Sequence, residues 1–169
     1  QNSVWAIFGS LVIVFFYILL RFQKWQFSLG AVSAVFHDVL IVLGIFSLTY
    51  KIMPFNMEIN QAFIAALLTV IGYSLNDTVV VFDRIREFFR IHKSWDNETT
   101  VNTALNSTLS RTLNTSLTTL IVLIAIFIFG GESIRGFMFA LIIGVMVGTY
   151  SSVFIATPIM FDSYKNKVN

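Results

Sequence analysis

Long apolar stretches alternate with short polar segments along this chain. A bilayer core about 30 Å thick needs roughly 20 mainly apolar helical residues to cross it. Five stretches meet that requirement, near residues 3–20, 29–50, 61–82, 112–129 and 134–160. The pattern therefore predicts an all-α fold, a polytopic membrane helix bundle of five transmembrane helices that forms a single domain over residues 1–169.

The segment from residue 83 to residue 111 is the longest polar stretch between two predicted spans. Apolar residues recur with a helical period over residues 98–111, which indicates an amphipathic helix. We expect a short helix at the cytoplasmic interface that leads into the fourth span. Arg111 would then lie at the inner edge of the hydrocarbon.

Composition is that of a membrane protein. Of the 169 residues, 56% are hydrophobic and only 12% are charged, against about 25% charged in an ordinary soluble domain. The chain begins at Gln1 without an initiator methionine or a signal-peptide pattern, so we expect it to be a fragment of a longer protein.

Charge and motifs exclude several classes of function. A formal net charge of +2 without a clustered basic face argues against nucleic-acid binding. The chain has no cysteine, and its two histidines and scattered acids lack metal-ligand spacing. The sequence patterns of hydrolytic enzymes are absent as well. We therefore expect no metal, no cofactor and no enzymatic activity.

Lysine and arginine residues gather on one side of the predicted membrane. Alternate segments place eight of them together, namely Arg21, Lys24, Arg84, Arg86, Arg90, Lys93, Lys165 and Lys167. Only Lys51 and Arg135 fall on the other side. By the positive-inside rule the larger group is cytoplasmic, which predicts an external first residue and a cytoplasmic C-terminus.

An amide and an acid, Asn76 and Asp77, interrupt the third apolar stretch. An ionisable group inside a membrane span is costly and usually marks an ion pathway. A buried carboxylate either pairs with a cation or takes up a proton, so Asp77 is the first candidate for a proton relay, and Asn76 beside it is included in the predicted relay. Arg111 lies at a roughly matching depth, and its long side chain makes a pair with Asp77 plausible. Its alternative role is that of a boundary residue at the membrane surface.

The other polar residues of these two spans have a simpler explanation. They form two stripes with helical spacing, Thr69, Gly72 and Asn76 in the third span and Arg111, Asn114 or Thr115, and Thr118 in the fourth. Hydrogen bonds from such side chains commonly hold membrane helices together, at about 0.6–2 kcal/mol each. Helix association is therefore the alternative to a proton route for these residues.

A second acid, Asp38, lies near the midplane of the second span and follows His37. An acid at that depth is again a functional candidate, so both residues join the predicted relay. A lone histidine more often packs and bonds a backbone carbonyl, and that alternative stays open for His37.

Small residues predict where helices approach one another closely. Gly72 lies on the stripe of the third span, and the last span contains Gly144-x-x-x-Gly148. Such spacing allows close helix contact. These glycines are predicted packing positions and have no catalytic role.

A charged helical extension follows the third span and contains Asp83, Arg84, Arg86 and Glu87. Pairing of Asp83 with Arg86, or of Glu87 with Arg90, would make it a self-neutralising face in solvent. The alternative is a docking surface for a partner on the cytoplasmic side.

Several long motifs resemble a known family. They occupy residues 37–39, 72–87, 105–112, 116–120 and 143–152, with the sequences HDV, GYSLNDTVVVFDRIRE, LNSTLSRT, SLTTL and IGVMVGTYSS. Their order and content closely resemble the SecF branch of the SecD/SecF family of bacterial protein-export membrane proteins. The resemblance covers essentially the whole chain.

This resemblance implies an accessory subunit of the Sec translocase in the bacterial inner membrane. Such proteins work with SecD, separate or fused, and with the SecYEG translocon, and use the proton-motive force to promote export of preproteins. The chain would be the last five spans, without the first span and the external domain. Asp77 and Arg111 match the family's membrane acid and arginine implicated in proton passage. The family is related to the resistance–nodulation–division exporters, which implies the architecture of their membrane domain.

Two other functions remain open from the residues. The five helices could be a scaffold that assembles SecD and the translocon, with the segment from Asp83 to Arg90 as the docking face. A small-molecule or lipid exporter of the related superfamily is the second alternative. The polar residues cluster toward the predicted cytoplasmic half, which favours a proton route over a substrate site at the midplane.

Overall fold

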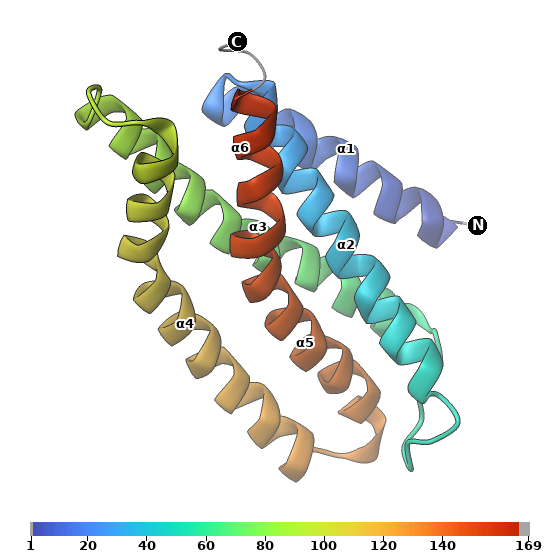
Figure 1. Cartoon of the computed structure of the whole chain (residues 1–169). Helices are drawn as coiled ribbons and strands as arrows, with labels where there is room; N and C mark the ends of the chain where they lie inside the picture. Colours follow the sequence, from blue (N-terminus) through green and yellow to red (C-terminus); the bar gives the residue numbers. More distant parts are fainter. Residues whose placement is uncertain (1, 166–169) are drawn as a thin grey trace.

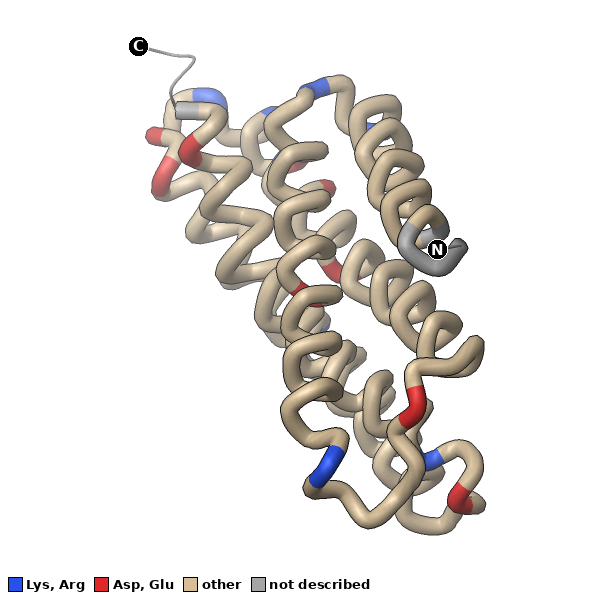
Figure 2. The backbone as a smooth tube through the Cα atoms, turned by 90° about the vertical axis from the view of Figure 1, so that its right-hand side faces the viewer, with Lys and Arg blue, Asp and Glu red and all other residues tan. Residues whose placement is uncertain are grey.

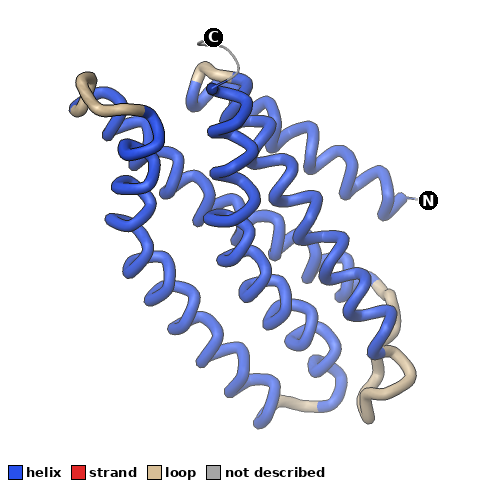
Figure 3. Tube along the Cα trace, in the orientation of Figure 1, coloured by secondary structure: helices blue, strands red, loops and turns tan. Residues whose placement is uncertain are grey.

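Helices are the regular elements of residues 2–165, the part of the chain that the computed structural model describes, and no strand occurs among these residues (Figure 1, Figure 3). In chain order they are α1 (Asn2–Phe22), α2 (Trp25–Thr49), α3 (Gln61–Ile91), α4 (Asn97–Phe129), α5 (Glu132–Ser151), the π-helical turn η1 (Ser152–Ala156) and α6 (Thr157–Lys165). The all-α class predicted from the apolar pattern is confirmed.

Four helical segments are long and apolar enough to cross a membrane: Trp25–Thr49, Gln61–Ile91, Asn97–Phe129 and Glu132–Tyr164. The apolar part of the first helix, Ile7–Phe22, is shorter. α5 packs against α2, α3 and α4, whereas α1 packs mainly on α2 at the edge of the bundle (Figure 1). The interior of the molecule is therefore built around α3 and α5.

The fourth span differs from the prediction. Residues 98–111 do not form a separate interfacial helix, because α4 runs without a break from Asn97 to Phe129. Asp96 caps its start, where the side chain accepts a hydrogen bond from the Thr99 N–H at 2.9 Å. These backbone and side-chain hydrogen bonds hold the pKa of Asp96 below its ordinary value. Between this cap and Gly130 the segment has no glycine or proline to end the helix.

The last span contains one turn of π-helix between α5 and α6. The Thr157 hydroxyl donates to the Ser152 carbonyl, five residues earlier, at 3.0 Å. Pro158 follows and has no backbone N–H for the ordinary helical bond. At Gly30 of α2, an added Cβ would collide with the Ala156 carbonyl oxygen, so α2 approaches this turn closely.

Two of the three predicted packing glycines lie at close helix contacts within the bundle. A Cβ at Gly144 would collide with the side chain of Val70, and one at Gly148 would lie 3.0 Å from the Ser74 Cβ. The prediction for Gly72 is wrong within this chain, because Gly72 is exposed and a Cβ there would meet nothing within 4 Å. The stripe of Gly72 faces out of the bundle, whereas Val70 and Ser74 face α5.

One end of the bundle is rich in lysine and arginine (Figure 2). We call it the basic end; it contains the turn between α1 and α2, the loop between α3 and α4, and the C-terminal turn of α6 (Figure 1). Lys51 and Arg135 lie at the opposite end. Gln1 and Lys167, which enter the predicted orientation, lie outside the described residues.

The charged extension of α3 makes different ion pairs from those predicted. Asp83 pairs with Arg21 of α1 at 2.9 Å, and Glu87 pairs with Arg84 at 2.7 Å. Arg86 donates to the Arg21 carbonyl at 3.1 Å. The predicted pairs within the helix, Asp83 with Arg86 and Glu87 with Arg90, do not form, because Asp83 pairs with Arg21 of α1 and Glu87 with Arg84.

Candidate functional site

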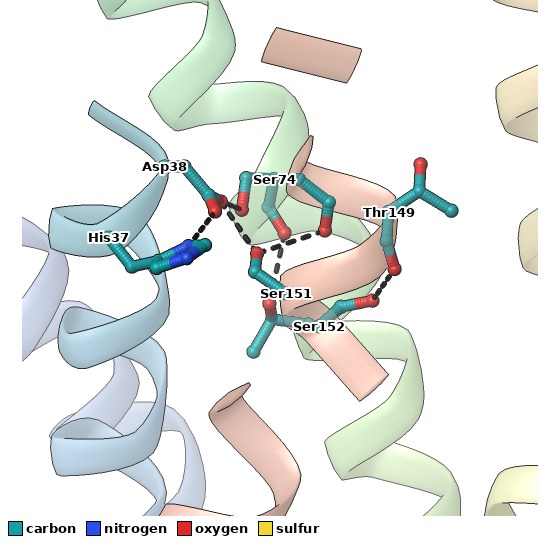
Figure 4. A network of polar contacts seen from close by, with 8 residues as sticks. His37, Asp38, Ser74, Thr149, Ser151 and Ser152 are labelled. Atoms are coloured by element: carbon teal, nitrogen blue, oxygen red, sulfur yellow. Dashed lines mark hydrogen bonds and ion pairs between the residues drawn. The ribbon is translucent and has the colours of Figure 1, made fainter. Parts of the chain in front are cut away.

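Asp38 lies at the centre of three helices (Figure 4). It is on α2 and is 0% exposed. Its Oδ2 accepts a hydrogen bond from Ser74 Oγ of α3 at 2.5 Å and another from Ser151 Oγ of α5 at 2.7 Å. Its Oδ1 lies 3.1 Å from His37 Nδ1. A carboxylate accepts but cannot donate, so this arrangement matches an acid whose partners are all able to donate.

His37 connects this buried carboxylate to the outside of the bundle. Its side chain is 33% exposed, while that of Asp38 is fully buried. The Nδ1 atom donates to Asp38 only in the tautomer or charge state that places a proton there. The Nδ1 atom of His37 contacts the neighbouring carboxylate and not a backbone carbonyl, which was the alternative for this residue.

Asp77 of α3 is also buried, with 4% of its surface exposed, but its contacts are sparser. Ser116 Oγ of α4 lies 3.4 Å from its Oδ2. Ser116 in turn lies 2.6 Å from Thr149 Oγ1 of α5, and Tyr73 donates to Ser116 at 3.4 Å. Asp77 therefore reaches α4 directly and α5 through one hydroxyl.

The predicted contact between Asp77 and Arg111 is not formed. Salt bridges within 4.0 Å among the described residues join Arg21 to Asp83 and Arg84 to Glu87, and the His37–Asp38 contact is an ion pair only when the imidazole is protonated. Arg111 is exposed on α4, whereas Thr112 and Ser116 of the same helix are buried. The depth estimate could not fix which way each side chain points around its helix.

Asn76 likewise lies on the outside of the bundle, not beside Asp77 in the interior. Arg111, Asn114 and Thr118 of α4 are exposed as well, and we use the name outer polar face for these four exposed polar residues of α3 and α4. Such side chains are costly against lipid. This face therefore calls for a protein or water neighbour within the membrane.

Hydroxyls that connect to the two acids lie on the same turn of α5. Thr149 contacts Ser116, which reaches Asp77, and Ser151 contacts Asp38. Ser74 and Asp77 are also one turn apart on α3. Two groups of polar side chains, one around Asp38 and one around Asp77, thus lie directly before the π-helical turn, and α5 contributes a hydroxyl to each.

The hydroxyl partners are the part of this site that the sequence analysis missed. Ser74, Ser116, Thr149 and Ser151 occur in the sequence analysis only within the long motifs that carry the family resemblance. A hydroxyl in an otherwise apolar span was the available signal. That signal is weak, because most such hydroxyls bond their own helix.

No cluster of three or more metal-ligating acids or histidines occurs among the described residues. The site therefore consists of carboxylates, hydroxyls and one imidazole. These groups can bind, release and pass protons through hydrogen bonds.

Comparisons with known proteins agree with this architecture. Residues 1–166 match the family described as Protein export membrane protein SecD/SecF, C-terminal. The chain is 57% identical to the protein translocase subunit SecF of Rhodothermus marinus over 96% of this chain, and 44% identical to that of Haemophilus influenzae over 96%. The match covers 52% and 48% of those two relatives. The chain belongs to the SecD/SecF family, and the resemblance predicted from its motifs is confirmed.

A solved structure agrees as well. The chain aligns over 99% of its length with a crystal structure of SecDF in a super-membrane-facing form, with a TM-score of 0.84 and 40% sequence identity. The alignment covers 22% of that protein, which has the fold of the resistance–nodulation–division exporters. The predicted fold class is thereby confirmed. The chain spans about half the length of the curated relatives it matches.

Proposed function

We propose that this chain is the membrane part of a Sec translocase subunit that uses the proton-motive force to promote export of preproteins. In this proposal it sits in a bacterial inner membrane with its basic end in the cytoplasm. It works with SecD and the SecYEG translocon, and it is a transport subunit without enzymatic activity of its own. The family membership supports the translocase role.

One observation above all supports the use of protons: Asp77 is buried in a span without an ion-pair partner among the described residues. A buried carboxylate without a cation either takes up a proton or holds its charge at considerable cost. Its single long hydroxyl contact, 3.4 Å to Ser116, leaves most of the hydrogen-bonding capacity of its oxygens unused. A purely structural acid would have its oxygens bonded, as Asp38 has.

Proton binding at Asp77 can change contacts elsewhere in the bundle. Ser116 links Asp77 to Thr149 of α5, next to the turn where the last span becomes π-helical. π-Helical turns within longer helices are frequent at functional sites. In the proposed mechanism, protonation changes the Asp77–Ser116 contact, and the last span adjusts at η1.

Arg111 has an electrostatic role in this proposal, from the outer polar face. A guanidinium does not lose its proton, so it favours the charged form of a nearby acid and disfavours a second cation. Asn76 and Arg111 face away from this chain's interior, where a second membrane bundle such as that of SecD would meet them.

The test uses the full-length subunit with SecD and the translocon in membrane vesicles. Asp77→Asn keeps the shape of the side chain but removes its charge and its proton chemistry. We expect it to abolish the gradient-dependent part of preprotein export while ATP-driven export and complex assembly stay unchanged. Leu68→Ala, at an exposed apolar position of the same helix, is a control for local disturbance of α3.

Full retention of gradient-driven export by Asp77→Asn would contradict the proton role and leave the scaffold function. In that case the ion-paired surface that includes Asp83, Arg84, Arg86 and Glu87 would become the part of the chain to test for docking. A small-molecule or lipid exporter is less well supported, since the polar groups of the interior are single hydroxyls and acids packed between helices.

A further inference from the structure

Thr112 is an exception among the threonines of α4. Hydroxyls of helical threonines usually bond a carbonyl one turn back, and the others from Thr100 onward do so, namely Thr100, Thr103, Thr108, Thr115, Thr118 and Thr119. Thr112 is only 2% exposed, and its Oγ1 is buried with no hydrogen-bond partner among the described residues. Each such group in a native protein calls for an explanation, and buried water molecules typically bond polar groups of this kind.

The neighbours of Thr112 on the same face of α4 are also hydroxyls. Thr108 lies one turn before it and Ser116 one turn after it, and both are buried. We call these three the α4 hydroxyl stripe. Residues four apart on a helix have Cβ atoms about 5–6 Å apart. One water joins two oxygens up to about 5.6 Å apart through two bonds of about 2.8 Å, so a single water can bridge neighbouring hydroxyls of the stripe.

The stripe ends at Asp77. Ser116 Oγ lies 3.4 Å from the Asp77 carboxylate. Toward the basic end, Arg84 Nε donates to Ser107 Oγ at 3.0 Å, which fixes how α3 and α4 run past each other. Thr112 lies between these two contacts, level with the residues of α3 that follow Asp77.

At the basic end the same face of α4 lines a cleft. The cleft has a volume of about 290 Å³ and lies between α4 and α6. Val101 and Leu105 line it on one side and Pro158 and Phe161 on the other, with Glu98 and Asp162 at its polar margin. Leu105 is one turn before Thr108 or Leu109, so the cleft wall continues along α4 into the hydroxyl stripe.

From these observations we propose that water enters this cleft and passes along Thr108 and Thr112 to Asp77, so that the α4 hydroxyl stripe is the proton route between Asp77 and the basic end of the bundle. The inference rests on the proposed function for the use of protons, but its geometry does not. Thr112 is the step at which a water is held by protein hydroxyls, and its loss should interrupt the route. Thr112 is a positioning residue, because it orders water and does not itself bind the transported proton.

Water access is tested by single cysteines, which the cysteine-free chain permits. In the full complex, otherwise free of accessible cysteines, Thr108→Cys and Thr112→Cys are treated with a charged, membrane-impermeant thiol reagent. We expect both to react in inverted vesicles, with the cytoplasmic face outward, and not in right-side-out vesicles. Leu113→Cys, the next residue on the exposed apolar side of α4, should stay unlabelled from both sides.

Use of the route by protons is tested by Thr112→Val, which keeps the shape of the side chain but removes the hydroxyl. We expect gradient-driven export to slow about tenfold, the equivalent of one ordinary buried hydrogen bond. Thr112→Ser, which restores the hydroxyl, should recover the rate. Thr103→Val, at an exposed threonine bonded to the Thr99 carbonyl, should leave it unchanged.

The outcomes separate this inference from the proposed function. An unlabelled Thr112→Cys overturns the water route, whatever Asp77→Asn does. If Thr112→Val exports at the full gradient-driven rate while Asp77→Asn fails, the proposed function stands and the route is overturned. If Asp77→Asn itself retains gradient-driven export, the proposed function fails, and the use of this route by protons fails with it.

Discussion

At the scale of single residues, the two buried acids differ in how their oxygens are satisfied. Asp38 accepts two short hydroxyl bonds and contacts an imidazole nitrogen, while Asp77 has one contact at 3.4 Å. A carboxylate has room for about four hydrogen bonds. Asp77 therefore keeps the capacity to bind water or a proton donor. Asp38 uses its capacity to hold α2, α3 and α5 together, and its predicted part in a relay stays a prediction.

Replacement of Asp38 should separate its structural role from its charge. Asp38→Ala removes the acceptor of Ser74, which makes no other side-chain bond among the described residues, whereas Ser151 keeps the Gly148 carbonyl at 3.2 Å. A buried donor left without an acceptor costs about 1–3 kcal/mol. We expect Asp38→Ala to lower the free energy of unfolding of the full-length subunit by that amount, measured by denaturant titration in detergent.

Asp38→Asn is the matched control. Its amide oxygen can accept from Ser74 and Ser151, and its NH₂ can donate to His37 Nδ1, so the network survives without the charge. We expect stability close to that of the original chain. A loss as large as that of Asp38→Ala would contradict a hydroxyl network held by geometry and indicate that the negative charge itself is needed.

The sequence indicated these acids but not their partners. Asp38 and Asp77 are conspicuous because an ionisable side chain in an apolar run is rare. Ser74 and Ser151 lie 36 and 113 residues from Asp38, and only the packing of three helices brings them to it. Arg111 shows the limit of counting residues, since a rise of about 1.5 Å per residue gives depth but not the direction of a side chain around its helix.

At the scale of helices, hydropathy predicted the four segments that are long and apolar enough to span a membrane, but not where each helix begins. α4 extends fifteen residues before the predicted span at 112–129 because Asn97 to Arg111 are polar yet contain no helix breaker. Hydropathy measures preference for lipid and not for helix, so the start of the apolar span and the start of the helix differ here. The π-helical turn has no sequence period of its own and could not be predicted from an apolar run.

Close contact between α3 and α5 depends on glycine at particular positions of α5. A methyl group at Gly144 would collide with Val70 of α3. Overpacking of this kind costs about 1–3 kcal/mol, so we expect Gly144→Ala to lower the free energy of unfolding of the full-length subunit by about that much. Thermal denaturation of the detergent-solubilised complex measures the change.

Gly72→Ala provides the comparison on α3. Space around Gly72 is open, and alanine favours helix over glycine by up to about 1 kcal/mol, so stability should stay the same or rise. Equal losses at Gly72 and Gly144 would mean that the face of Gly72 is packed in the assembled complex. That result would place a partner directly against the outer polar face.

At the scale of the whole molecule, part of the surface of the bundle suits lipid and part of it does not. The apolar exposed residues of α1, such as Ile13 and Leu20, suit lipid. Arg111 and Asn114 on α4 do not, since charged and polar side chains exposed to lipid are costly. The alignment with SecDF, in which this chain corresponds to 22% of the longer protein, agrees with a surface that is covered in a larger assembly.

Site-directed cross-linking identifies what covers the outer polar face. With single cysteines in the full-length subunit, we expect Asn114→Cys to form a cross-link to SecD in membranes, because a partner that offers polar groups removes the cost of exposing this face to lipid. Ile13→Cys, on the exposed apolar side of α1, should form none.

The reverse pattern, with SecD captured from α1 and only lipid or water beside Asn114, would show that the partner binds elsewhere. The outer polar face would then border a water-filled space that leads to Asp77 from the side of α3 and α4, and both acids of the bundle would have to be reconsidered as groups open to solvent within the membrane.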